Sequence, residues 1–494
     1  MKIGMPLRLF ALSLAALTAQ PCPAGPATLV RGVTVIDVGA GAHQKSDLLL
    51  RGDRIAELRP SGELIAPAGA KIIEASGLFA IPGLWDMHIH LTSPGLEDRV
   101  LKLLVANGVT SVRDTGGELE AVLAIRERAN RVGEVAPRVW VAGPILDGKP
   151  RAWRGHGSSS GMIEVDSEQQ AIELVDTLSA RAVDFIKVYE MLRPNVFRAV
   201  VKRAHEHGLR VTAHVPIRMT TIETLDAGLD GIEHLRGIEF DCAEEPAALL
   251  AQRVAIMDAW DSDDRGYALR RKVHATVRPD ALTSQSPANC GGLVDRFADQ
   301  GTWHTPTLHF VAFRVLRFYE DSHWIDPLRY LPEDIRAQRM EMLADFKDLS
   351  KYKEWETHGE WAMHTVARLH QAGATLMTGT DSPGFIFMPG FSLHDELEAL
   401  VRAGLTPLAA LQAATITPAR FFDVDDQLGT IEAGKLADLV LLEEDPLSDV
   451  SNTRRIAAVI VKGRLLDRKE LDGILGGMST ERNLGKLTSE DRDR

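Results

Sequence analysis

Eight short runs of strand-forming residues recur between positions 83 and 380, and helical stretches separate most of them. The runs read "GLWDMHIH", "VTSVRD", "RVWVAG", "DFIKVY", "RVTAHV", "GIEHL", "TWHTPTL" and "TLMTGT". Between them, "SEQQAIELVDTLSARA" and "PNVFRAVVKRAHEHG" carry apolar residues at three- and four-residue spacing, which is typical of helices packed on one face. Strands that alternate with helices predict an α/β fold, and eight such units predict a (β/α)8 TIM barrel.

The two ends of the chain have a different pattern. Residues 25–82 and 426–475 contain short β-patterned runs with glycine turns, so we expect them to form together a small β-sandwich domain. The barrel would then occupy residues 83–425, with long insertions at 240–300 and 311–371. Insertions after the sixth and seventh strands of a barrel lie over its mouth, and the alternative is peripheral helical padding.

Residues 1–24 have the pattern of a secretory signal peptide. Lys2 and Arg8 precede an apolar stretch that is too short to span a membrane, and small residues follow it. We therefore expect an exported protein, periplasmic or secreted. Cys22 offers a lipid anchor as an alternative, although the proline before it fits a lipidation site poorly. Residues 476–494 are polar and aperiodic, and they predict a flexible tail.

The charge of the chain narrows its partners. The formal net charge is −13 at pH 7 and there is no basic run, which argues against nucleic acid and anionic membranes. We expect a small-molecule substrate and no stable membrane insertion, and a homo-oligomer is left open. After the signal, Cys242 and Cys290 either pair in an oxidising compartment or remain as two buried thiols.

Residues of the types that can bind metals lie in or directly after the predicted strands, towards their carboxyl ends. His88 and His90 close the first strand two residues apart, so their side chains share one face. The other candidates are Lys187 in the fourth strand, His214 in the fifth, His234 in the sixth and Asp381 directly after the eighth. In a barrel these ends meet at one mouth. A single histidine in a strand is more often a packed residue, but this joint placement predicts a site for Zn²⁺ or a similar ion.

Taken in order, these motifs resemble the metal-dependent amidohydrolase superfamily. The resemblance rests on "GLWDMHIH", "FIKVY", "TAHV", "IEHL", "TGTD" and the closing "LGTIEAGKLADLVLLEEDP". It spans residues 28–470 and is strongest to the imidazolonepropionase-like and Xaa-Pro-dipeptidase-like branch.

The resemblance implies a binuclear metal centre. His88, His90 and Asp381 would hold one divalent ion, His214 and His234 the other, and Lys187 would bridge the two as a carbamate formed with CO₂. Zn²⁺ is the expected metal. A hydroxide bridging the two ions would attack the scissile carbonyl, and Asp381 would be the catalytic residue that passes the proton to the leaving nitrogen.

Four further residues are candidates for substrate binding. Tyr189 lies two residues after Lys187, His156 follows the third strand and His304 lies in the seventh. Arg113, at the end of the second strand, either anchors an anionic substrate or pairs with Asp114.

We expect an exported hydrolase that cleaves an amide-type C–N bond in a dipeptide, an N-acyl amino acid or a cyclic amide. The stretch "KVYEMLRP" departs from the glycine-rich sequence typical of the peptidases at this point, so dipeptide specificity is not favoured. A lactonase or esterase with the same centre is one alternative. A non-catalytic metal- or ligand-binding barrel is another, and Asp381 argues against it because a binding module needs no proton shuttle.

Overall fold

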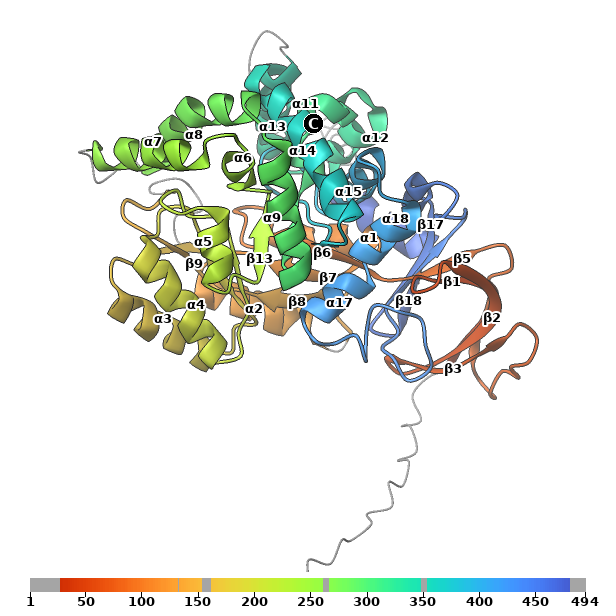
Figure 1. Cartoon of the computed structure of the whole chain (residues 1–494). Helices are drawn as coiled ribbons and strands as arrows, with labels where there is room; N and C mark the ends of the chain where they lie inside the picture. Colours follow the sequence, from red (N-terminus) through yellow and green to blue (C-terminus); the bar gives the residue numbers. More distant parts are fainter. Residues whose placement is uncertain (1–26, 132, 153–160, 261–265, 348–352, 480–494) are drawn as a thin grey trace, which may run out of the picture.

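The structure, a computed structural model, describes most of the chain (Figure 1). The described ranges are 27–131, 133–152, 161–260, 266–347 and 353–479. The predicted signal peptide at 1–24 and most of the predicted tail lie outside them.

Strands from both ends of the chain form one eight-stranded sheet, at the right of Figure 1. Its strands are β1 (Ala27–Asp37), β2 (Ala42–Arg51), β3 (Arg54–Pro60), β4 (Lys71–Glu74), β5 (Phe79–Pro82), β16 (Leu439–Leu442), β17 (Ile456–Val461) and β18 (Arg464–Asp467). The N-terminal β5 pairs antiparallel with the C-terminal β16. Apolar residues from both halves, including Val30, Leu48 and Ile460, share one core. Both β-rich ends therefore contribute to one sheet, and the sandwich arrangement stays a prediction.

The middle of the chain is a mixed α/β region with parallel strands. Eight strands coincide with the eight predicted runs: β6 (Leu84–Ile89), β7 (Val109–Asp114), β8 (Arg138–Val141), β11 (Ile186–Val188), β12 (Val211–Ala213), β13 (Gly231–Glu233), β14 (Trp303–Thr305) and β15 (Thr375–Leu376). β6, β7 and β8 form one parallel sheet, and β11 to β15 pair in order in a second. Two strands that were not predicted, β9 (Ile145–Asp147) and β10 (Met162–Glu164), extend the second sheet.

Backbone hydrogen bonds connect the two parallel sheets at both sides. The amide of Met87 in β6 donates to the carbonyl of Thr378, just after β15, at 2.9 Å. The amide of Asp184, just before β11, donates to the carbonyl of Val141 in β8, also at 2.9 Å. The carboxyl ends of β6 and β15 consequently lie side by side.

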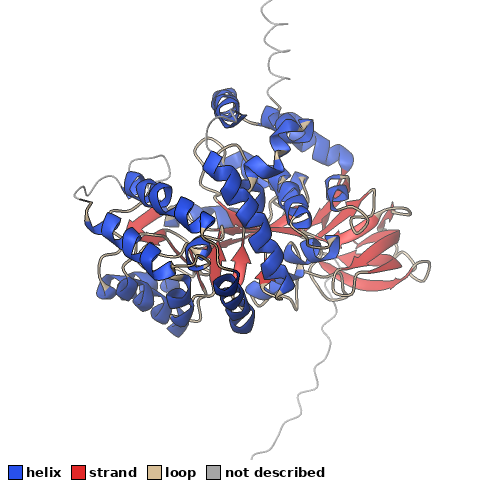
Figure 2. Ribbon diagram, turned by 45° about the horizontal axis from the view of Figure 1, so that its top comes forward, coloured by secondary structure: helices blue, strands red, loops and turns tan. Residues whose placement is uncertain are grey.

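Helices pack around the parallel strands (Figure 2). Those that follow the first five of the eight predicted strands are α1 (Glu97–Ala106), α2 (Leu119–Ala129), α3 (Glu168–Ala180), α4 (Pro194–Glu206) and α5 (Thr221–Asp226). α4 illustrates how the sequence determines a helix and its buried face. Pro194 starts the helix, and its buried residues Val196, Val200 and Ala204 recur at four-residue spacing. Among the described residues, no helix is both long and apolar enough to cross a membrane.

The two predicted insertions are mostly helical. The first contains α6 (Ile238–Asp241), α7 (Pro246–Asp258), α8 (Gly266–Thr283) and α9 (Pro287–Gln300). After β14 come α10 (Leu308–Val311), α11 (Phe313–Leu316), α12 (Ser322–Ile325), α13 (Glu333–Lys347) and α14 (Lys353–Gln371). A disulfide joins Cys242 at the end of α6 to Cys290 in α9, which answers the question left open about these cysteines. Side chains from α8 and α13 reach residues around the carboxyl ends of the strands.

The chain ends with α15 (Phe391–Arg402), α16 (Pro407–Ala413), α17 (Ile416–Phe421) and α18 (Arg468–Met478). The predicted tail started too early, because α18 continues to Met478. A capping box between Asp467 and Glu470 starts this helix, and its contacts with α1 hold it.

Candidate metal centre

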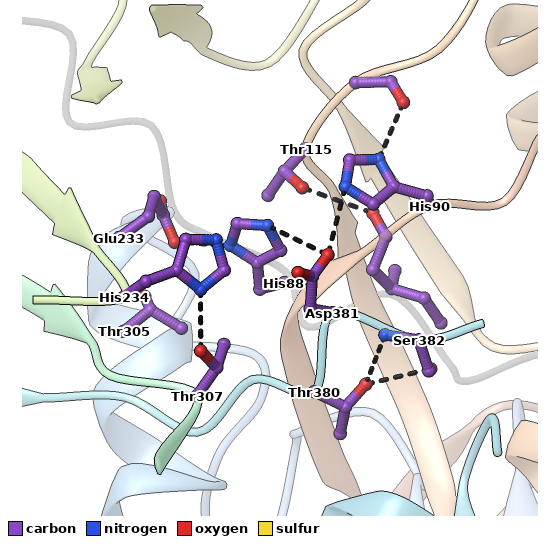
Figure 3. Close-up of polar contacts among 12 residues, drawn as sticks. His88, His90, Thr115, Glu233, His234, Thr305, Thr307, Thr380, Asp381 and Ser382 are labelled. Atoms are coloured by element: carbon purple, nitrogen blue, oxygen red, sulfur yellow. Dashed lines mark hydrogen bonds and ion pairs between the residues drawn. The ribbon is translucent and has the colours of Figure 1, made fainter. Parts of the chain in front are cut away.

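Three of the predicted ligands meet where β6 and β15 end (Figure 3). His88 lies in β6, His90 follows it by two residues, and Asp381 follows β15. Oδ1 of Asp381 is 3.7 Å from Nε2 of His88 and 3.3 Å from Nε2 of His90. One possible ligand atom from each residue lies within 4.8 Å of the others, which is close enough to hold one metal ion.

The two other predicted histidines belong to the same cluster. His214 and His234 directly follow β12 and β13. The ring of His234 is 4.3 Å from that of His88 and 4.8 Å from that of His214, measured between centroids. The four histidines therefore form one cluster. His88 and His90 lie at or directly after the end of β6 of the first parallel sheet, and His214 and His234 directly follow β12 and β13 of the second.

Each of these four imidazoles is held by its Nδ1 atom. The partners of Nδ1 are Glu233 for His88 at 2.7 Å, the carbonyl of Gly116 for His90 at 2.9 Å, Glu190 for His214 at 2.8 Å and the Thr307 hydroxyl for His234 at 2.6 Å. Ionised carboxylates and carbonyls only accept, and the Thr307 hydroxyl already donates to Pro306. At His88, His214 and His234, Nδ1 is thus the donor and Nε2 keeps its lone pair, which is the arrangement found around metal-bound histidines. At His90 the contact of Nε2 with Asp381 outweighs burial and raises the pKa to about 8.

Burial keeps three of these imidazoles in the neutral form that binds metals. Removal from water lowers the pKa of His88 to about 4, and it holds the pKa values of His214 and His234 well below the usual range. Asp381 is different, because its contacts with His90 and His88 outweigh burial and lower its pKa. The site therefore offers neutral nitrogens and an ionised carboxylate, which is a suitable donor set for divalent ions.

Lys187 lies in β11 with its amine inside the protein. Its side chain is fully buried, and Nζ has no hydrogen-bond partner within the described part of the chain. Burial, reinforced by the positive charge of Arg113, lowers the pKa of Lys187 to about 8. An amine with this pKa is about half deprotonated near pH 8, and the neutral form can react with CO₂ to give a carbamate, which would supply a further anionic ligand.

Arg113 has a different role from the two that were predicted. It donates to Glu233 at 2.7 Å, to the carbonyl of Met87 and to Thr305. Asp114, the predicted partner, instead accepts backbone amides. A fully buried guanidinium paired in this way is not available to a substrate, so Arg113 is a positioning residue for Glu233 and through it for His88.

Glu190 was not predicted, although it lies three residues after Lys187. Besides His214, it accepts hydrogen bonds from Arg270 at 2.8 Å and from His274 at 2.5 Å, both on α8. Burial alone would raise the pKa of Glu190, but these contacts hold it well below the usual range. The first insertion thus contributes to the support of a candidate ligand.

The predicted substrate residues have separate outcomes. Tyr189 lies beside the cluster, with its ring 4.3 Å from that of His214. His304 does not: its ring packs edge-on against Phe297 of α9 at 4.5 Å, because it faces the opposite side of β14 from Thr305. The structure gives no support to a substrate contact by His304. His156 lies outside the described residues.

Two of the candidate ligands have left-handed backbone conformations. φ is +56° at His234 and +57° at Asp381. Such conformations are uncommon outside glycine and persist where surrounding structure enforces them. At Asp381 the amide donates to the carbonyl of His88 at 2.7 Å, and Thr380 is held by Asp86. The turn directs the Asp381 carboxylate toward the histidines.

A fold of parallel strands and helices with histidines and a carboxylate at the strand ends defines an α/β protein with a candidate metal site. The model of the Amidohydrolase family matches residues 79–264 and 359–466, which is more than half of the sequence. The chain belongs to the amidohydrolase family, and the predicted family and hydrolase class are confirmed at this level.

Relatives by sequence match only part of the chain. A dihydroorotase from Geobacter sulfurreducens is 42% identical over 89 residues, which is 17% of this chain and 20% of that protein. A dihydroorotase from Leifsonia xyli subsp. xyli is 33% identical over 161 residues, which is 30% of this chain and 36% of that protein. The matches thus cover about a fifth to a third of these curated relatives.

Solved structures match over nearly the whole fold. A Xaa-Pro dipeptidase with bound methionine is 19% identical, with 89% of this chain and 100% of that chain covered and a TM-score of 0.62. A bottromycin amidohydrolase is 24% identical, with 93% and 91% covered and a TM-score of 0.65. A putative prolidase from Bifidobacterium longum is 23% identical, with 92% and 100% covered and a TM-score of 0.61. At these identities the likeness is one of fold.

Proposed function

We propose that the chain hydrolyses an amide C–N bond in a small molecule that carries a carboxylate, with two divalent metal ions, most suitably Zn²⁺. The observation that carries this proposal is the cluster of four imidazoles, each held through its Nδ1, in which the Nε2 atoms of His88 and His90 lie beside the ionised Asp381 and the rings of His234 and His214 follow next to His88. His88, His90 and Asp381 would hold one ion, and His214 and His234 the other. Lys187, as a carbamate, would bridge them.

The donor set fits such a pair of ions. Lys187 is a buried amine without a partner among the described residues, and a carbamate there would exchange an uncompensated cation for a ligand. When bound, the ions would lower the pKa of a water molecule and polarise the scissile carbonyl.

Asp381 is the residue that would move protons. Its carboxylate is ionised, 17% exposed, and only 3.3 Å from His90, so it can accept a proton from the attacking water. It would then give the proton to the nitrogen as the C–N bond breaks. The products would be a carboxylic acid and an amine, which balances the addition of one water.

Arg236, an arginine near the site with one unpaired nitrogen among the described residues, supports a carboxylate on the substrate. Arg236 lies two residues after His234, and its buried Nε has no hydrogen-bond partner in the described part of the chain. Arg270 and Arg278 lie near it with the same charge, but each is already paired with a glutamate, Glu190 and Glu239. A guanidinium in this position needs an acceptor, and a substrate carboxylate would supply one. This favours N-acyl amino acids, dipeptides or cyclic amides with an acid group over neutral amides.

We also propose that the two parallel sheets close into one barrel and that the two-ended sheet forms a small sandwich. The hydrogen bonds from Met87 to Thr378 and from Asp184 to Val141 support barrel closure. The Cys242–Cys290 disulfide supports export to an oxidising compartment, as proposed from the N-terminal pattern.

A substrate screen of zinc-loaded and metal-stripped protein tests the proposed function. The panel holds dipeptides, N-acyl amino acids, cyclic ureides, neutral amides and lactones. Metal-dependent release of an amine or ring-opening of an acid-bearing amide is the expected result. Turnover of lactones alone, or none of the panel although two ions bind, would overturn it.

A further inference from the structure

Two phenylalanines in contact lie between His234 and the turn that follows Asp381. Phe310 in α10 has its ring 6.1 Å from that of His234, in an edge-to-face arrangement. Phe385 follows Asp381 by four residues, and its ring is 5.1 Å from that of Phe310. Phe387 packs behind both and is itself buried. A continuous aromatic surface therefore runs from His234 to the turn that carries Asp381.

The structure of this turn holds the side chain of Phe385 in an exposed position. Its side chain is 43% exposed, which is unusual for a residue in contact with a large aromatic cluster. Its φ is +49°, a strained value for an aromatic residue. Arg339 of α13 holds both sides of the turn, because its guanidinium donates to the carbonyls of Pro383 and Phe387. The side chain of Arg339 is buried, and the hydrogen bonds of its guanidinium to described residues go to these two carbonyls of the turn.

We propose that Phe310 and Phe385 bind an apolar, preferably aromatic, acyl group of the substrate. This rests on the proposed function, in which Arg236 takes the carboxylate on the leaving side of the amide. Phe310 contacts His234 through its ring, and Phe385 contacts Phe310 from the turn that begins at Asp381, so a group stacked on the two rings would be attached close to the scissile carbonyl. Stacking would cover the exposed face of Phe385 and compensate for its exposure to water. The substrate class is then an N-arylacyl or long-chain N-acyl amino acid.

The test compares N-phenylacetyl-L-alanine with N-acetyl-L-alanine as substrates of the zinc-loaded full chain. We expect the wild-type protein to favour the phenylacetyl compound in kcat/KM by at least about tenfold. Phe385→Ala should reduce this ratio by about tenfold, and Phe385→Leu by less, because leucine keeps apolar contact. Ile72→Ala is the matched control: Ile72 is 44% exposed, and it lies in β4 of the other sheet. It should leave the ratio at the wild-type value.

Calorimetric binding of 4-phenylbutyrate and butyrate separates this inference from the proposed function. Binding of phenylbutyrate that weakens about tenfold in Phe385→Ala supports the aromatic site, even if no amide is hydrolysed and the proposed function fails. Metal-dependent turnover with equal kcat/KM for the two acyl groups would overturn the aromatic site and leave the proposed function intact. A preference that persists unchanged in Phe385→Ala would also overturn it.

Discussion

Glu233 accepts a hydrogen bond from Nδ1 of His88 at 2.7 Å, although the two residues are 145 positions apart in the sequence. The other oxygen of Glu233 accepts from Arg113, also at 2.7 Å. One buried carboxylate thus ties β13 to β6 and β7, and it fixes the orientation of a candidate metal ligand.

Replacement of Glu233 should weaken both metal binding and folding. Glu233→Gln removes the anion that orients His88, and we expect metal affinity to fall about 10–100-fold. It also leaves the charge of Arg113 buried without compensation, at a cost of about 3–5 kcal/mol of unfolding free energy. Metal titration and urea unfolding measure the two effects. Glu74→Gln is the control, since it breaks a pair with Arg31 at 2.8 Å on the exposed surface and should cost less than about 1 kcal/mol. Equal effects of the two replacements would contradict this role of Glu233.

Lys187 should carry a carbamate when metal is bound. In protein loaded in ¹³C-bicarbonate, NMR should detect one carbamate carbon that disappears in Lys187→Met and on acidification. Lys102→Met, which changes an exposed lysine, should keep the signal. Metal affinity should fall at least about hundredfold in Lys187→Met, because a bridging ligand is lost. A metal-loaded wild-type protein without this carbon would rule out the carbamate.

His394 should make the protein less stable in mild acid. Burial lowers its pKa to about 3 in the folded protein, with a further contribution from the charge of Arg454. The unfolded chain therefore binds a proton near pH 6.5 that the folded protein refuses, so stability falls as pH decreases through this range. Between pH 6.5 and 4 this amounts to at most about 3 kcal/mol.

Urea unfolding of wild type and His394→Gln between pH 7 and 4 tests this dependence. The stability advantage of the wild type should shrink as pH falls, since glutamine does not titrate. The exposed His364→Gln controls for loss of any histidine. A difference in stability between wild type and His394→Gln that does not change with pH would show that His394 is not the source of the acid sensitivity.

The disulfide should stabilise the first insertion. Its cysteines are 48 residues apart in the chain, and loss of such a cross-link costs about 2–5 kcal/mol. Cys242→Ala/Cys290→Ala and reduced wild type should therefore unfold at similarly lower urea concentrations than oxidised wild type. Alkylation of two free thiols in oxidised, native protein would contradict the pairing.

The strands and the candidate ligands could be predicted because each signal is local. His88, His90, His214, His234 and Asp381 lie at or just after the ends of four of the strand-forming runs, and parallel strands bring their carboxyl ends together. The short β15 shows the limit, since only Thr375–Leu376 of the run "TLMTGT" is strand.

Partners across the fold could not be predicted. Arg113 pairs with Glu233 and not with the adjacent Asp114, because contact in space is independent of proximity in sequence. Alternation along a strand places neighbouring residues on opposite faces, yet Glu233 and His234 both serve the site. The left-handed backbone at His234 breaks the alternation, and nothing local in "IEHL" announces that turn.

The proposed role of Asp381 is tested most directly by measuring metal content and turnover together in Asp381→Asn. Asparagine keeps the size and one oxygen of the side chain but cannot take up the proton. We expect zinc-loaded Asp381→Asn to retain bound metal while kcat on the best substrate of the screen falls by at least about a hundredfold. Turnover close to that of the wild type, at equal metal content, would contradict this role.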